Sequence, residues 1–165
     1  MEEKRLIKLF EYNWQVRDEW LNWCETIPEE ALFKKRVGGV HSIHYTLFHI
    51  IEVEYSWIRA IQEKQDVPID YKDYPSIASL QSLSRECRDE IVSFFADNSN
   101  FNSNKQVRPA WEETSFSIQD ILHHVIVHEV HHIGQLSIWA REVGVEPISA
   151  SFIDRDMKKV SDYLE

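Results

Sequence analysis

Four long segments of this chain keep the residue spacing of an amphipathic helix, and little interrupts them. They span residues 2–26, 42–64, 77–96 and 117–143, with apolar side chains recurring at helical intervals. The whole chain has only 4 Gly and 5 Pro, which is too few for a fold built from many tight turns. We therefore expect an all-α four-helix bundle that forms a single domain over residues 1–165.

Local signals predict where these helices begin and end. Ser42 and Ser76 suit the N-cap position, and Ser117 with Asp120 has a form close to a capping box. Gly144 suits the position that follows the last long helix. Between these helices we expect a short helical turn at 28–33, a loop at 34–40 that contains two adjacent glycines, and a short helix near the end at 154–164.

The connection between the second and third long helices, residues 65–75, contains two prolines and is expected to be non-helical. Fully extended, about ten residues reach ~33–36 Å. That reach is close to the length of a ~23-residue helix at ~1.5 Å per residue. A parallel crossover between the second and third helices would therefore just fit.

Acidic residues outnumber basic ones, 28 against 18, and the formal net charge is −10. Nucleic acids and anionic membrane surfaces both attract clustered basic residues, and the densest basic run here is the short Lys34-Lys35-Arg36. The chain has no apolar run of ~18 residues, and its first residues lack the apolar core of a signal peptide. We therefore expect a cytoplasmic protein with no nucleic-acid partner and no membrane partner.

The last long segment carries five of the chain's 8 histidines. His128 and His132 are spaced i, i+4, which puts two imidazoles on one helix face about 6 Å apart at Cβ and suits a shared metal ion. At ~100° per residue, both fall within the apolar stripe of this segment and Glu129 falls at its edge. An unpartnered polar pair in such a stripe costs several kcal/mol. A metal site is therefore favoured over the alternative, two core histidines that hydrogen-bond to the backbone or to carboxylates.

The run His128-Glu129-Val130-His131-His132 also matches the HExxH motif, in which the Glu acts as the general base of a metalloprotease. A five-residue match of this kind also arises by chance fairly often. A structural or ligand-supporting carboxylate is therefore the favoured role for Glu129, with catalysis as the alternative.

A zinc-like or nickel-like ion requires at least a third protein ligand. His49 in the second long segment is a candidate, although its angular position supports it only weakly, and His41 and His44 lie nearer the start of that segment. Three imidazoles would leave an open coordination position, which is typical of a catalytic site. Glu52, three residues after His49, either orients that ligand or is a solvated surface residue, which is favoured. Gln135 lies beside the predicted ligands.

The Asn-rich segment 97–116 is long for a connection within one domain, so it is expected to be functional or mobile. It directly precedes the histidine-rich segment and contains Arg108 and Trp111. This cation and this flat apolar surface could receive the acidic or apolar part of a substrate. The alternative, which is favoured, is a surface connection whose Trp111 only packs against the bundle.

The runs HSIHYTLFHIIEVEYSWI at 41–58 and HEVHHIGQLSIWAREVG at 128–144 resemble the DinB-like (YfiT-like) superfamily, and the resemblance covers essentially the whole chain. The family pattern is a histidine in the second long helix, then HxxxH followed by Gly-Gln in the last. His49, then His128 and His132, then Gly134-Gln135 match it here. The choice of His49 over His44 depends mainly on this match. The resemblance implies a four-helix bundle, often a homodimer, in which three histidines bind one divalent ion. By ligand type that ion is zinc or nickel.

The resemblance also implies a range of activities. Relatives include S-transferases that depend on low-molecular-weight thiols such as bacillithiol or mycothiol, and a thiol-dependent isomerase. We therefore expect a metal-dependent enzyme that acts on a small molecule, first of all a thiol S-transferase with a low-molecular-weight thiol as cosubstrate. A metal-dependent hydrolase and a non-enzymatic, stress-associated metal-binding protein are the alternatives.

Overall fold

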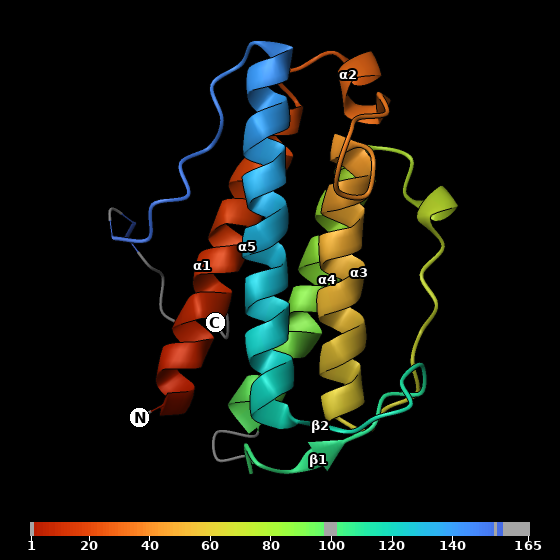
Figure 1. Ribbon diagram of the computed structural model, residues 1–165, viewed down its shortest axis with the longest axis vertical. Coiled ribbons are helices and arrows are strands. Elements are labelled where there is room, and N and C mark those ends of the chain that lie inside the picture. The colour runs from red at the N-terminus through yellow and green to blue at the C-terminus, as the bar shows by residue number, and fades with distance from the viewer. Residues whose placement is uncertain (1, 98–101, 154, 157–165) are drawn as a thin grey trace.

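The computed structural model describes residues 2–97, 102–153, 155 and 156. Its long helices are α1 (Glu2–Cys24), α3 (Ile43–Ile61), α4 (Ile77–Asp97) and α5 (Ile118–Val143), as Figure 1 shows. The shorter elements are the helix α2 (Glu29–Phe33), the 3-10 turn η1 (Tyr71–Asp73) and the strands β1 (Gln106–Val107) and β2 (Phe116–Ser117). The expected all-α class is confirmed.

The long helices form a bundle in which α1 and α5 run one way and α3 and α4 run the other (Figure 1). Both α3 and α1 contact α5 and α4, so the order around the bundle is α1, α5, α3, α4. Residues 62–76 return along the outside of the bundle from the end of α3 to the start of α4. The parallel crossover between these two helices is therefore present.

The predicted helix caps are confirmed. The Oγ atoms of Ser42, Ser76 and Ser117 accept hydrogen bonds from the backbone N–H three residues on, at 3.1, 3.2 and 3.0 Å. Gly144 has a φ of 84° and follows α5, as a left-handed residue after a helix should. The helix that we expect over 154–164 falls almost entirely outside the described residues.

The long connection before α5 contains a short antiparallel pairing of β1 with β2, in which Val107 lies opposite Phe116. Strands of two residues carry no sequence period, so this pairing was not predicted. It closes the connection against the end of the bundle, where the side chain of Val107 is buried. The pairing thereby positions the residues that directly precede α5.

Two apolar clusters fill the core, one around Trp20 and Leu47 and the other around Phe10 and Ile58. Along α1, the buried Arg17 lies between Trp14 of one cluster and Trp20 of the other. In the described part of the chain, no helix is long and apolar enough to cross a membrane.

Candidate metal centre between α3 and α5

The ring nitrogens of His49 on α3 and of His128 and His132 on α5 converge. The Nε2 atom of His128 lies 3.2 Å from Nε2 of His49 and 3.2 Å from Nε2 of His132. One ligand atom from each residue lies within 4.8 Å of the others. Among the residues that the structure describes, this is the group of His, Cys, Asp and Glu side chains that could hold a metal ion.

These separations fit a metal ion. Two nitrogens bound at ~2.0–2.1 Å to one ion, with tetrahedral or octahedral angles, lie about 2.9–3.4 Å apart, and the observed spacing is 3.2 Å. Each neutral imidazole has one N–H and one lone pair. The three converging nitrogens cannot all form hydrogen bonds with one another. A shared cation, in contrast, can bind the lone pair of each nitrogen that faces it.

Gln135 fixes the orientation of one predicted ligand. The Nδ1 atom of His132 is 2.8 Å from Oε1 of Gln135, and since this oxygen can only accept, the imidazole donates. Nε2 of His132 is then the lone-pair nitrogen, and it faces the other two rings. The Gln135 amide nitrogen in turn lies 2.9 Å from Nε2 of His131, to which it can donate. Gln135 therefore contacts one of the predicted ligands, and its role in supporting a metal ligand stays a prediction.

The loop before α3 approaches Gln135 closely at Gly39. A Cβ atom built on Gly39 would lie only 2.4 Å from Oε1 of Gln135, and Gly39 has a φ of +52°. A residue with a side chain would therefore clash with the group that orients His132. Sequence reasoning missed this contact, and the adjacent glycines in the predicted loop were its only signal.

The environment keeps the three imidazoles neutral. Burial lowers the pKa values of His49, His128 and His132 below the ordinary value for histidine. The effect is largest for His128, where burial and the neighbouring histidines lower the pKa to about 3. Neutral imidazole is the form that binds a metal ion, so these residues are ready to act as ligands at neutral pH.

Glu52 lies close to His49, with Oε2 at 3.8 Å from Nδ1. This separation is too long for a hydrogen bond, and a neutral His49 carries no charge that could pair with the carboxylate. Burial, with a smaller effect from Asp66, raises the pKa of the Glu52 carboxyl. Its role in orienting His49 stays a prediction.

Glu129 lies deeper in the bundle than the sequence analysis expected. The angular estimate put His128 within the apolar stripe and Glu129 at its edge. Instead Glu129 is 1% exposed, and His128 is only partly buried. Both carboxylate oxygens of Glu129 accept hydrogen bonds from Arg17, at 2.9 and 2.5 Å. This pairing favours the structural role for Glu129 over that of a general base.

Arg17 joins three helices at this level. Besides Glu129 on α5, its guanidinium donates to Oε1 of Glu54 on α3 at 2.8 Å, and Trp14 donates to the other oxygen of Glu54 at 2.9 Å. The two carboxylates raise the pKa of Arg17 against the opposing effect of its burial. Sequence reasoning missed this network. Its signal was a charged residue, Arg17, at an apolar position of the first helix.

Trp111 packs onto the bundle but stays 43% exposed. Its ring lies 5.5 Å from that of Trp57 on α3, which in turn lies 5.3 Å from the ring of His124. His124 is one helical turn before His128, and their rings are 5.8 Å apart. Arg108 instead donates from Nε to the backbone oxygen of Glu112 at 3.2 Å, within its own loop. Trp111 is thus connected to the histidines through aromatic contacts, and Arg108 makes no such contact.

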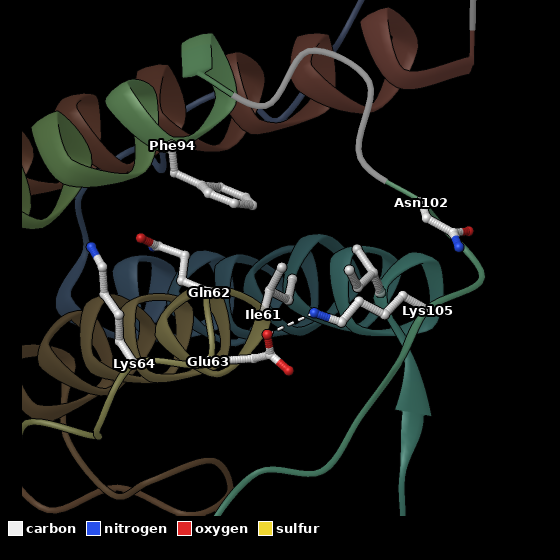
Figure 2. A pocket seen from close by; sticks show the side chains of 8 residues that line it. Ile61, Gln62, Glu63, Lys64, Phe94, Asn102 and Lys105 are labelled. Atoms are coloured by element: carbon white, nitrogen blue, oxygen red, sulfur yellow. Dashed lines mark hydrogen bonds and ion pairs between the residues drawn. The ribbon is translucent and has the colours of Figure 1, made fainter.

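Two cavities differ in their distance from the histidines. One of about 330 Å³ lies near the ends of α3 and α4, where Lys105 reaches across to Glu63 at 2.7 Å (Figure 2). Its lining contains neither His nor Cys. The other, of about 310 Å³, is lined in part by Trp57 and His124. Only the second of these two therefore adjoins the candidate metal centre.

The cysteines do not contribute a nucleophile. Cys24 and Cys87 are both buried and unpaired. Burial raises the pKa of each thiol to about 12, so both stay protonated at neutral pH. Any thiol that reacts at the histidine centre must come from outside the chain.

Comparison with known proteins finds a family and two relatives for this chain. A model of the DinB family matches residues 1–159. The chain is 50% identical over 159 residues, 96% of its length, to the whole of an uncharacterized protein, YizA, of Bacillus subtilis (strain 168). It is 20% identical over 146 residues to the protein DinB of the same organism, an alignment that covers 83% of this chain and 85% of that one.

Proposed function

The chain belongs to the DinB family, and from that premise we propose that it is a metal-dependent enzyme that transfers a low-molecular-weight thiol to an electrophilic small molecule. In this reaction the thiol sulfur forms a bond to an electrophilic carbon, the thiol proton goes to solvent, and the leaving group departs with the bonding electrons. The observation that carries the proposal is the convergence of three neutral imidazole nitrogens from α3 and α5.

Two further observations support a catalytic site over a structural one. Three protein ligands leave room for an exchangeable partner on the ion, and the side chain of His49 is 26% exposed, so this room is accessible from solvent. The chain's own thiols are buried and protonated. An external thiol could therefore reach the ion without competition from the thiols of Cys24 and Cys87.

The residues have distinct tasks in this proposal. His49, His128 and His132 would hold the ion, and Gln135 would keep His132 in the tautomer that presents Nε2. A divalent ion of the zinc or nickel type would supply Lewis-acid chemistry, lowering the pKa of a thiol or a water molecule that reaches it. The choice between zinc and nickel is part of the proposal.

Hydrolysis is the second candidate reaction because the same ion could activate water. The residue that sequence reasoning offered as its general base, Glu129, already accepts two hydrogen bonds from Arg17. The structure offers no specific observation in favour of hydrolysis, so thiol transfer ranks first. A non-enzymatic metal-binding protein ranks third.

Metal content tests the site. Elemental analysis of the purified protein should give about one zinc or nickel per chain, and His128→Ala and His132→Ala should each lose most of it. The matched control is His123→Ala, which removes an exposed histidine from the same helix and should leave the metal content unchanged. Full occupancy in both test variants would overturn the assignment.

Thiol dependence tests the reaction. The metal-loaded protein is assayed with monochlorobimane as the electrophile and with bacillithiol, cysteine and glutathione as thiols. We expect turnover that requires both the ion and one of these thiols. Turnover of ester substrates that requires the ion but ignores added thiol would identify a hydrolase. A cobalt-substituted protein whose absorption spectrum no thiol perturbs would identify the non-enzymatic alternative.

A further inference from the structure

A second site adjoins the metal centre at the start of α5. The cavity of about 310 Å³ is lined by Trp57, Glu112, Phe116, Asp120, Ile121 and His124. Its wall is mostly apolar and aromatic, and the two carboxylates supply its formal charge. Because His124 lies one helical turn from His128, with the two rings 5.8 Å apart, the cavity and the histidine centre share one surface of the bundle.

Trp57 is held in place by other rings. The rings of Trp111, Phe116 and His124 lie 5.5, 5.9 and 5.3 Å from it, at interplanar angles of 83°, 78° and 63°. Edge-to-face contacts of this kind stabilise aromatic pairs and fix their orientation. The indole is therefore a rigid wall for the cavity, and Trp111, itself 43% exposed, is one of the rings that support it.

The carboxylates of the cavity have no cationic partner. In the described part of the chain, no Lys, Arg or His nitrogen lies within 4.0 Å of the carboxylate of Glu112 or Asp120. Arg108 contacts only the backbone oxygen of Glu112. Asp120 accepts a hydrogen bond from the Ser117 hydroxyl at 2.6 Å. The cavity thus combines aromatic side chains with carboxyl groups that no cationic side chain contacts in the described part of the chain.

This combination selects for one class of ligand. The face of an indole ring attracts organic cations, and an unpaired carboxylate adds to that attraction while it repels anions. We propose that the cavity binds an organic cation with an apolar or aromatic body, and that this group belongs to the electrophilic substrate. The assignment to a substrate rests on the proposed function; the binding of the cation does not.

Calorimetry on the metal-free protein tests the binding. Benzyltrimethylammonium, benzyl alcohol and benzenesulfonate share a ring and differ in charge, and removal of the metal excludes direct coordination of the sulfonate. We expect the cation to bind about fivefold to tenfold more tightly than the alcohol, and the sulfonate to bind most weakly. Equal affinity for the three, or a preference for the sulfonate, would overturn the proposal.

Variants locate the binding in this cavity. Glu112→Gln should lower the affinity for the cation about threefold to fivefold and leave the affinity for benzyl alcohol unchanged. Glu113 is an exposed neighbour outside the lining of the cavity, so Glu113→Gln should change neither affinity. Trp57→Leu should remove most binding of both. Unchanged affinity for the cation in Glu112→Gln contradicts the proposal even if Trp57→Leu fails to fold. Metal content and thiol dependence are measured separately, so cation binding in a protein without thiol turnover would refute the proposed function alone.

Discussion

At the scale of single residues, Gly39 leaves no room for a side chain beside Gln135, which contacts His132. A methyl group on Gly39 would collide with Oε1 of Gln135, the atom that accepts the hydrogen bond from His132. Loss of such a supporting hydrogen bond typically weakens metal binding about 10-fold to 100-fold. We therefore predict that Gly39→Ala lowers zinc affinity by about this factor, measured by competition with a chromogenic chelator.

Gly38 provides the matched control for this prediction. It also has a positive φ, +84°, but a Cβ atom built on it meets nothing within 4 Å. Gly38→Ala therefore introduces similar backbone strain without the collision, and it should keep the zinc affinity of the parent. If the two variants bind zinc equally well, a side chain at position 39 does not weaken metal binding through Gln135.

At the scale of the helices, Arg17 holds α1, α3 and α5 together through two buried carboxylates. Removal of one partner leaves uncompensated buried charge, which commonly costs 3–5 kcal/mol. We predict that Arg17→Met lowers the free energy of unfolding by about that amount, as measured with urea. Lys105→Met breaks the exposed pair with Glu63 and should cost at most about 1 kcal/mol. Equal losses in the two variants would contradict a structural role for the network.

The crossover between α3 and α4 should make the stability of the bundle depend on pH. His44 on α3 is buried beneath this segment, with Nδ1 at 2.9 Å from the hydroxyl of Tyr71. Burial lowers the pKa of His44, and a contact with the backbone of Ser76 opposes this effect. The unfolded chain takes up a proton as the pH falls below ~6.5, while the folded state keeps His44 neutral. Its contribution to stability is therefore full above that pH and is lost as the pH falls towards the lower, folded pKa.

Comparison of two variants measures this effect. In metal-free protein between about pH 7 and pH 5, we predict that His44→Gln loses less unfolding free energy than the parent does as the pH falls. Tyr71→Phe removes the hydroxyl but retains most of the burial, which is the main cause of the pKa shift, so it should keep the parental slope. A parental slope in His44→Gln would show that His44 does not contribute.

The helices could be predicted because their signals are local. Ser42, Ser117 and Gly144 each act within one turn of chain, and the i, i+4 spacing of His128 and His132 follows from helix geometry alone. Its angular position supports His49 only weakly, because its partners lie on another helix, and its choice over His44 depended mainly on the family resemblance. The pairing of Arg17 with carboxylates on α3 and α5, like that of β1 with β2, depends on packing between distant segments. The periodicity of residues within one segment cannot predict contacts between segments that are distant in the sequence.

At the scale of the whole molecule, the homodimer that the family resemblance implies stays a prediction. Multi-angle light scattering on the metal-loaded protein should give twice the chain mass of 19.6 kDa. A mass of one chain at micromolar concentration would contradict it. The same measurement on metal-free protein would show whether any association requires the ion.

The metal should also stabilise the whole bundle without being needed to form it. Binding to the folded state alone adds about 2.7 kcal/mol when free metal is at 100 times its Kd, which corresponds to a rise in Tm of about 5–10 °C for a chain of this size. The two apolar clusters that fill the core contain no histidine, so chelation should lower Tm while helicity at room temperature is retained. Circular dichroism melts with and without zinc measure both quantities, and His128→Ala should show no zinc-dependent shift. A chain that unfolds at room temperature on chelation would instead identify a structural metal, as in a zinc finger, and would count against an exchangeable catalytic ion.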